Sequence, residues 1–180
     1  ITLVIDPIKS LMHDQDDHLK EAGIDTTTFV DSSLKGAEKA RRIKHFQDGQ
    51  FQFTFITPER LMIQEFRNAL TKMGSGTSPK WFVYCVIDEA HCVSEWGHDF
   101  RTAYLRLGEN ARTFCKPASG NLPFIALTGT ASFDVLSDVQ RELHLKDDQA
   151  IVSLESYQRE ELHFEVITVQ KPQDLLASKK

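Results

Sequence analysis

Hydrophobic residues in this chain occur in short runs, and longer amphipathic segments separate the runs. Most runs are apolar at nearly every position, which is typical of strands inside a sheet that is covered on both faces. The most apolar run, Trp81–Ile87, should form a central, buried strand. The runs predicted to form strands are Thr2–Ile5, Thr26–Val30, Phe51–Ile56, Trp81–Ile87, Phe124–Leu127 and Ala150–Leu154.

The segments between these runs have the spacing of helices. Ser132 is placed to cap a helix that includes Val139, and Pro58 suits the first turn of a helix that runs through Phe66. A loop is expected at Gly74–Pro79, before the most apolar strand. Because strands and helices alternate, the pattern predicts an α/β fold in which helices flank a parallel sheet.

The composition fits one globular domain. Of the 180 residues, 41% are hydrophobic and 26% are charged, and no stretch reaches the roughly 20 apolar residues of a membrane span. Three cysteines without C-x-x-C spacing argue against a disulfide framework and a zinc site, and they favour a reducing cytoplasm. The first residue is Ile1 rather than a methionine, so we expect the chain to be part of a longer one.

The net charge limits how the chain can bind nucleic acid. The formal charge is -5, whereas a protein that holds nucleic acid by its general field is basic, so any contact should be local. One basic run fits a helix with Ala40, Ile43 and Phe46 on its apolar side. A solvated face is the favoured interpretation, and DNA binding is the alternative. The run consists of Lys35, Lys39, Arg41, Arg42 and Lys44.

Two acidic residues, Asp88 and Glu89, directly follow the most apolar run. In a parallel α/β sheet, ligands bind beyond the carboxyl ends of the strands. Adjacent carboxylates at that place suit magnesium-assisted phosphoryl transfer, because one can hold Mg²⁺ and the other can orient the attacking water. A solvated acidic turn is the alternative. The unbroken run Asp88-Glu89-Ala90-His91 after an apolar strand favours the functional interpretation.

Polar side chains also follow other predicted strands. The hydroxyls of Thr128 and Thr130 can hydrogen-bond the neighbouring carboxylates, or Thr130 and Ser132 merely cap a helix. Thr57 precedes a helix start, where a phosphate can bind or where the residue acts only as a cap. A metal site is disfavoured near Ser10, because neighbouring helical residues point in different directions, and a surface is favoured instead. The residues in question are His13, Asp14, Asp16, Asp17 and His18.

The fourteen residues from Asp88 to Arg101 resemble the second helicase motif of RecQ-type DNA helicases, joined to the aromatic-rich loop of that family. The resemblance implies that Asp88 holds the magnesium ion, that Glu89 is the catalytic carboxylate and that His91 relays between the nucleotide and the DNA. It also implies that Trp96, His98, Phe100 and Arg101 sense single-stranded DNA. Base stacking on aromatic rings, at about 1–3 kcal/mol per base, supports that role. Alternatively, Trp96 and Phe100 anchor the following helix to the core.

Other segments are similar to motifs of the same family and occur in the family's order. Thr128 and Thr130 match the third motif, which passes the nucleotide state onward, although Gly129 replaces the commoner alanine. Thr57 lies in a segment similar to one that touches the DNA backbone. Ser10 lies in the motif that follows the phosphate-loop unit, where Asp6 replaces the usual serine and weakens the case for DNA binding.

The resemblance covers nearly the whole chain and implies a partial RecA-like lobe of the P-loop NTPase class. Residues 1–155 correspond to the later part of the first motor lobe. Residues 156–180 correspond to a linker and the start of the second lobe, with Ser156–Leu162 at the passage. No G-x-x-x-x-G-K-[ST] pattern occurs. The phosphate-loop strand is therefore expected before Ile1, and the isolated chain is expected to be inactive.

By the same resemblance, the parent protein uses ATP and Mg²⁺ to move 3′ to 5′ along single-stranded DNA and to unwind duplexes. Forked DNA is the implied substrate and DNA repair the implied setting, with no membrane partner. Two alternatives stay open. One is a translocase or DNA-dependent ATPase that does not separate strands, and the other is a non-catalytic binding module. A phosphate loop upstream in the parent chain would favour the motor.

Overall fold

A computed structural model of the chain describes residues 1–75, 79–94, 102–130, 132–145, 151–152, 161–163 and 165–166. The chain divides into two units, Ile1–Lys146 and Asp147–Lys180. The helices and strands of the described residues all belong to the first unit. No helix among the described residues is long and apolar enough to cross a membrane. The predicted boundary between residues 155 and 156 stays a prediction.

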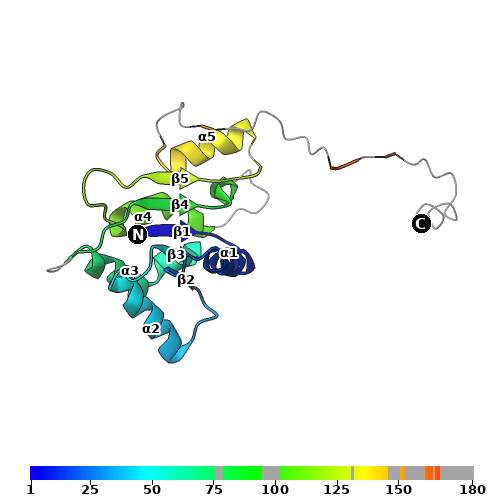
Figure 1. Cartoon of the computed structure of the whole chain (residues 1–180). Helices are drawn as coiled ribbons and strands as arrows, with labels where there is room; N and C mark the ends of the chain where they lie inside the picture. The colour runs from blue at the N-terminus through cyan, green and yellow to red at the C-terminus, as the bar shows by residue number, and fades with distance from the viewer. Residues whose placement is uncertain are drawn as a thin grey trace. The chain divides into compact units, whose positions relative to one another are not determined.

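A five-stranded parallel sheet forms the centre of the first unit, in the order β2-β3-β1-β4-β5 (Figure 1). Ile5, Ile56 and Ile87 lie side by side at the carboxyl ends of three of these strands. We call the edge of the sheet formed by the residues that directly follow the strands the carboxyl rim. The strands are β1 (Thr2–Ile5), β2 (Thr27–Val30), β3 (Phe53–Ile56), β4 (Tyr84–Ile87) and β5 (Phe124–Ala126). The predicted parallel sheet is therefore confirmed.

The strand predicted to be central is shorter and less buried than expected. The middle of the sheet is β1, and β4 is its neighbour. β4 begins at Tyr84 rather than at Trp81, because its ladder partner β1 begins at Thr2, which lies opposite Tyr84. Trp81 and Tyr84 are 37% and 44% exposed. The apolar run thus predicted where β4 lies in the sequence, but pairing with β1 determines the residue at which β4 begins.

The other strand predictions hold to within about two residues where the structure describes them. β2 begins at Thr27 and β3 at Phe53, each slightly later than predicted. In the predicted strand Ala150–Leu154, Ile151 and Val152 are described and are not part of a strand, and the other positions lie outside the described residues. In the predicted loop at residues 74–79, positions 76–78 also lie outside them.

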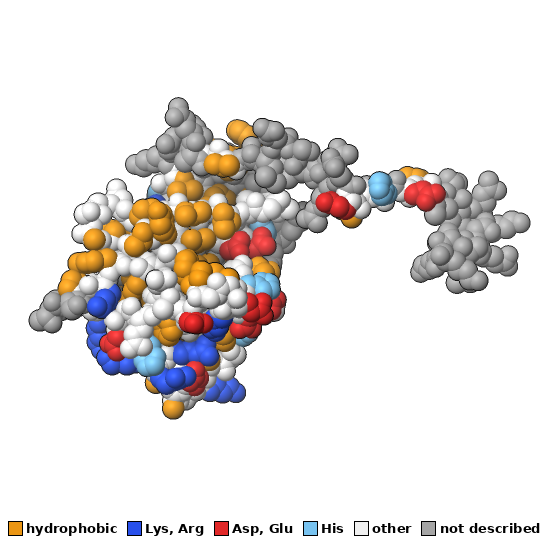
Figure 2. All heavy atoms as spheres, in the orientation of Figure 1, with side chains coloured by type: hydrophobic (Ala, Val, Ile, Leu, Met, Phe, Trp, Pro, Cys, Tyr) orange, Lys and Arg blue, Asp and Glu red, His pale blue; other side chains and the backbone are white. Residues whose placement is uncertain are grey.

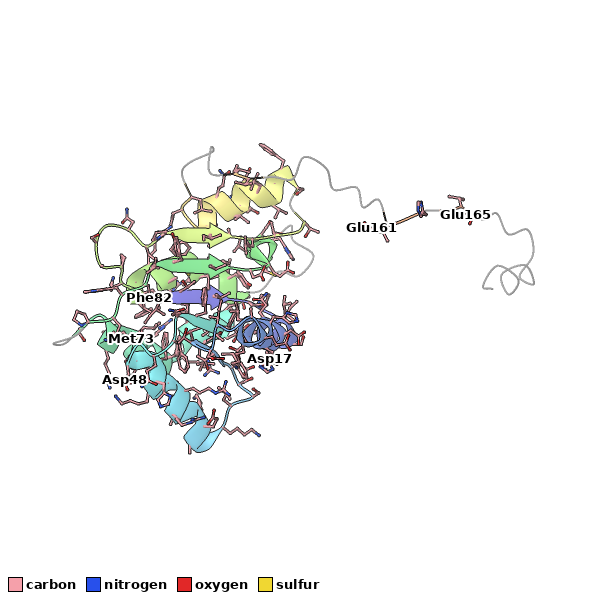
Figure 3. All side chains as sticks on the ribbon, in the orientation of Figure 1. Asp17, Asp48, Met73, Phe82, Glu161 and Glu165 are labelled. Atoms are coloured by element: carbon pink, nitrogen blue, oxygen red, sulfur yellow. The ribbon has the colours of Figure 1, made fainter. Side chains whose placement is uncertain are left out.

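Helices cover the two faces of the sheet unequally. The face that carries Leu3 and Ile87 packs against α2, α3, α4 and α5 in the main core, which includes Met73 and Phe82 (Figure 3). The opposite face packs against α1 through Met12. The helices are α1 (Lys9–Glu21), α2 (Gly36–Gln47), α3 (Gln64–Met73), α4 (Leu107–Phe114) and α5 (Phe133–Glu142). The short 3-10 turns are η1 (Pro58–Met62), η2 (Ala90–Val93) and η3 (Thr102–Tyr104).

The α1 side of the sheet is open over β4 and β5. Tyr84, Ile125 and Leu127 lie on that side and are 44%, 41% and 47% exposed. Figure 2 shows hydrophobic side chains gathered over this part of the sheet. α1 contacts β2 and β3 instead. This apolar surface, which we call the open face, has no helix over it among the described residues.

The segment after β3 is helical but broken. The prediction of one helix from Pro58 through Phe66 is wrong at Ile63, whose φ of -86° and ψ of 121° separate η1 from α3. Leu61 and Phe66 are both buried in the main core. Five residues apart on a continuous helix, they would point in clearly different directions, because each residue turns the helix by about 100°. The break allows both side chains to face the core.

Two further helix predictions can be compared with the structure. Ser132 caps α5, since its Oγ accepts the Val135 amide at 3.4 Å. In α2, Ile43 is buried as predicted, but Ala40 is exposed. The cations of α2 pair with neighbouring acids, an arrangement typical of a solvated face. The pairs are Arg41–Glu38, Arg42–Glu38, Lys44–Asp48 and Lys39–Glu65.

Candidate active site

The catalytic candidates lie at the carboxyl rim, on the turn that joins β4 to η2. The Asp88 amide donates to the carbonyl of Ile5 at 2.8 Å and so continues the ladder between β4 and β1. The Asp88 carboxylate accepts the Glu89 amide at 2.9 Å and the side-chain amide of Gln15 at 3.2 Å. Each carboxylate oxygen has a donor, yet the residue is only partly buried. The carboxylate is therefore held in place and is accessible from solvent.

Glu89 has a left-handed backbone, with φ 48° and ψ 45°. Residues with side chains rarely adopt this conformation, and they keep it where the surrounding structure fixes the backbone, often at active sites. Ala90 provides such a constraint here, because it is fully buried and its amide donates to the carbonyl of Leu127 at 2.8 Å. The turn places Glu89 Oε2 3.2 Å from Nδ1 of His91.

His91 connects this acidic turn to the segment after β5. Its Nδ1 lies 3.1 Å from Thr128 Oγ1 as well as near Glu89. Because the Thr128 hydroxyl donates to the carbonyl of Thr130 at 3.1 Å, it can only accept from His91. We therefore assign a proton to Nδ1. Thr128 thus contacts the histidine rather than a carboxylate, and Thr130 takes part through its main chain.

Gln15 is a site residue that the sequence pattern did not single out. It follows the buried Met12 by one helical turn, so both side chains lie on the side of α1 that faces the sheet. That spacing is the signal that points to it. A hollow of about 400 Å³ lies beside Gln15 and Asp88, over the sheet surface that includes Val86 and Leu127. A ligand in this hollow would meet an apolar floor and the Asp88 carboxylate.

Tyr104 is a second contact that the sequence did not reveal. It belongs to η3, is 1% exposed and donates its hydroxyl to the main-chain oxygen of Asp88 at 3.2 Å. The residue lies sixteen positions after Asp88, beyond the aromatic-rich segment. The chain therefore returns to the catalytic turn after that segment.

The residues predicted to bind DNA have different environments. Ser10 lies in the first turn of α1 and is exposed. Thr57 precedes η1 and is 7% exposed, without a side-chain capping bond. Of these two hydroxyls, only that of Ser10 is open to a phosphate. The aromatic-rich candidates lie outside the described residues, namely Trp96, His98, Phe100 and Arg101.

Asp6, the acid that replaces the usual serine, is fully buried. Its Oδ1 accepts the Ile8 amide at 2.7 Å, at the point where the chain enters α1. Side chains of Asp and Ser commonly accept such an amide two residues on. Asp6 therefore stabilises the turn and does not present its charge to a ligand at the surface.

Asp31 forms a buried polar cluster at the end of β2. It accepts hydrogen bonds from the amide of Ser33 at 2.8 Å and from Nε2 of His13 at 3.0 Å. Burial raises the pKa of Asp31, but the bonds from Ser33 and His13 outweigh burial and hold it below its usual value. The nearby Arg60 is 4% exposed, and burial lowers its pKa while the charge of Asp31 opposes that shift.

The His and Asp residues of α1 do not form one site. His13 pairs with Asp31, and Asp17 is exposed (Figure 3). The expectation of a surface is wrong for Asp16, which is fully buried and accepts hydrogen bonds from Thr27 and Lys20. In the part of the chain that the structure describes, no group of three His, Cys, Asp or Glu side chains could hold a metal ion.

Comparison with known proteins places the chain in a helicase family. A family model described as DEAD/DEAH box helicase matches residues 1–139. The chain belongs to the DEAD/DEAH box helicase family.

Within that family its relatives are RecQ helicases, as the motifs indicated. It is 34% identical over 166 residues to the ATP-dependent DNA helicase RecQ of Bacillus subtilis. The matched residues make up 92% of this chain and 26% of that protein. It is 36% identical over 167 residues to the ATP-dependent helicase SGS1 of Saccharomyces cerevisiae, with coverages of 92% and 11%. The chain thus spans only about a quarter of the bacterial relative.

Solved structures agree on the fold. The Pyrococcus furiosus Hef helicase domain matches with a TM-score of 0.51 and 17% identity, over 81% of this chain and 27% of that one. The Mycobacterium smegmatis helicase Lhr, bound to ssDNA and AMP-PNP, matches with a TM-score of 0.52 and 16% identity, over 78% and 18%. At such identities the likeness concerns the fold alone, and it confirms the predicted RecA-like fold.

Proposed function

We propose that this chain belongs to the motor of a RecQ-type DNA helicase that hydrolyses ATP to move 3′ to 5′ along single-stranded DNA and to open forked duplexes. One observation carries the proposal. The turn Asp88–His91 brings two carboxylates and a histidine together at the carboxyl rim, and the histidine contacts the next strand's end. The relatives named above are ATP-dependent helicases, which supports ATP as the nucleotide.

Asp88 suits a magnesium ion. Its carboxylate is partly exposed beside the hollow, and carboxylate oxygens are preferred Mg²⁺ ligands. When bound, the ion would neutralise charge on the phosphates. Gln15 and the Glu89 amide would keep the carboxylate in position.

Glu89 would act on the attacking water. A carboxylate that orients a water molecule needs a fixed direction, and the left-handed backbone of Glu89 supplies one. His91 contacts both Glu89 and Thr128, so a change at either group alters the hydrogen bonding of the other. This link supports the coupling role proposed for Thr128, and for Thr130 through its main chain.

The open face supports the proposal that the phosphate loop lies elsewhere in the same protein. Contiguous exposed apolar surface marks a place where another segment or partner binds. We propose the phosphate-loop unit as that segment, because its strand and helix would extend the sheet beside β5 and cover Tyr84, Ile125 and Leu127. The three free, buried cysteines support a reducing compartment, and we propose the cytoplasm.

The test compares this chain alone with a helicase that also contains the phosphate-loop segment and the second motor lobe, here called the complete helicase. We expect the complete helicase to release phosphate in a DNA-stimulated manner and to open forks with a 3′ tail. We expect the isolated chain to release none. Hydrolysis without strand separation would favour the translocase. An absence of hydrolysis in the complete helicase would favour the non-catalytic module.

A further inference from the structure

Asp138 of α5 is a carboxylate on the buried side of an amphipathic helix. It is 9% exposed and lies among the core residues Val135 and Val139. Its Oδ2 accepts the Ser94 hydroxyl at 2.6 Å, and its Oδ1 accepts Nη2 of Arg141 at 2.7 Å. Burial of a charge is costly even when the charge is paired, and an apolar residue is often at least as stable. Stability alone therefore gives a weak reason for an acid at this position.

Ser94 occupies the end of the catalytic turn. It is fully buried, it follows η2 directly, and the aromatic-rich segment Glu95–Arg101 follows it in the sequence. Its amide donates to the carbonyl of His91 at 3.1 Å. A displacement of Ser94 would therefore pull on the same short turn that holds His91.

A described residue after the aromatic-rich segment, Tyr104, is also tied to the catalytic turn. Tyr104 follows the segment and donates its hydroxyl to the main-chain oxygen of Asp88. The chain thus leaves the catalytic turn at a bond to α5 and returns to it at a bond to Asp88. Ser94 before the segment and Tyr104 after it are therefore both fixed close to the proposed catalytic groups.

α5 has attachments that do not involve Asp138. Arg112 of α4 donates to the carbonyl of Leu143 at 2.7 Å, and its guanidinium lies 4.1 Å from the ring centre of Phe124. Gly108 allows α4 to approach closely, because a Cβ there would lie 2.8 Å from the Glu142 carbonyl oxygen. Loss of the Asp138 carboxylate should therefore remove the hydrogen bond that the Ser94 hydroxyl makes to α5 and leave α5 in place.

We propose that Asp138 is a positioning residue that fixes, through Ser94, the direction in which the chain leaves the catalytic turn. It thereby makes ATP hydrolysis responsive to DNA. The bond of His91, within η2, to Thr128 and the bond of Ser94, directly after η2, to Asp138 tie this turn to the segment after β5 and to α5. This inference rests on the proposed function, in which DNA at the aromatic-rich segment stimulates hydrolysis.

The test measures the ratio of DNA-stimulated to DNA-free hydrolysis in the complete helicase, together with the melting temperature. Ser94→Ala removes the donor, and Asp138→Leu removes the acceptor at similar volume. We expect each to lower the ratio by about fivefold or more, which is the size of a typical coupling between sites. Asp138→Asn keeps an oxygen that can accept the Ser94 hydroxyl, so it should restore most of the ratio.

Asp16 supplies a matched control. Like Asp138 it is a buried carboxylate that accepts a hydroxyl on one oxygen and a basic side chain on the other, from Thr27 and Lys20. Asp16→Leu should lower the melting temperature at least as much and leave the ratio unchanged. In hydrogen exchange, the Ser94 amide should exchange faster in Asp138→Leu and not in Asp16→Leu.

Three outcomes would count against these ideas in different ways. An unchanged ratio in Ser94→Ala and Asp138→Leu overturns the positioning role of Asp138. A ratio that falls equally in Asp16→Leu assigns the effect to lost stability and overturns it as well. A wild-type helicase whose hydrolysis ignores DNA overturns the proposed function, and the inference with it.

Discussion

The carboxyl rim has two halves that use charged residues differently. At the ends of β1 and β2, Asp6 and Asp31 are fully buried, and each accepts an amide two residues further along the chain. After β4, Asp88, Glu89 and His91 are only partly buried, and His91 contacts Thr128 after β5. The first half keeps its carboxylates away from solvent, whereas the second leaves them accessible to a ligand.

The difference teaches how to separate structural acids from candidate catalytic ones on the same rim. Asp31 has three donors from the chain, from the amide and hydroxyl of Ser33 and from His13. Among the residues that the structure describes, Glu89 has one such neighbour, His91, and its backbone is held in a left-handed conformation. A buried carboxylate whose oxygens all accept hydrogen bonds from the chain stabilises the fold. An accessible carboxylate on a constrained backbone is a candidate for catalysis.

The largest effect is expected at Glu89. Glu89→Gln in the complete helicase keeps the shape of the side chain and removes the charge that would orient water. We expect hydrolysis to fall by about 10²–10⁴-fold, the usual contribution of such a group, while ATP still binds. Phosphate release and nucleotide binding would be measured side by side, with Glu65→Gln on α3 as the surface control. Hydrolysis at the wild-type rate would remove Glu89 from the catalytic assignment.

A smaller effect is expected for Trp96, which lies eight residues after Asp88 in the sequence. Trp96→Ala should reduce DNA-stimulated hydrolysis by about tenfold relative to DNA-free hydrolysis, because a base stacked on a ring contributes about 1–3 kcal/mol. The other tryptophan of the chain, Trp81, is 37% exposed before β4 and serves as the control. If Trp96→Ala lowers the melting temperature and both rates together, the residue anchors the core and does not sense DNA.

Thr128 and Thr130 provide a sharper comparison within the second half. The side chain of Thr128 accepts from His91, whereas Thr130 takes part through main-chain atoms. Thr128→Val should slow hydrolysis by about fivefold, as expected for one lost hydrogen bond, and Thr130→Val should change it little. Equal rates in the two variants would contradict the relay through the Thr128 hydroxyl.

The smallest effect on activity is expected in the first half. Asp31→Asn should cost about 1–3 kcal/mol of stability and leave hydrolysis nearly unchanged. The folded-state pKa of Asp31 is lowered, so its ionised form stabilises the fold above the unfolded value, near pH 4. This stability is lost as the pH falls through the folded-state pKa. Urea unfolding from pH 7 to pH 3 should show the gap between wild type and variant narrowing below about pH 4.

The reactivity of the buried cysteine thiols tests the packing of the main core beneath both halves of the rim. Cys85 and Cys115 are fully buried, and burial raises the pKa of Cys85 to about 12 and that of Cys115 well above its usual value. Neither thiol should react with a disulfide reagent at pH 8 until the protein unfolds, because the thiolate is the reactive form. Rapid labelling in the folded state would contradict the described packing of β4.

Features that depend on neighbouring residues could be predicted from the sequence. The Ser132 cap and the place of Asp88 at a strand end follow from a few adjacent positions. Contacts between distant segments could not, because they depend on how helices pack. Gln15 meets Asp88 across 73 positions, and Ser94 meets Asp138 across 44. The middle position of β1 escaped prediction for the same reason, since apolar runs show burial and not strand order.

The middle position of β1 has a consequence for synthesis on the ribosome. β1 emerges before both of its partners, β3 and β4, and β4 begins roughly eighty residues later. At about 5–20 residues per second, the strand that holds the sheet together waits about 4–16 s for its second partner. During that interval the edge of β1 that pairs with β4 stays open. A nascent chain with this strand order is therefore a natural client for chaperones that bind short apolar segments at the exit tunnel.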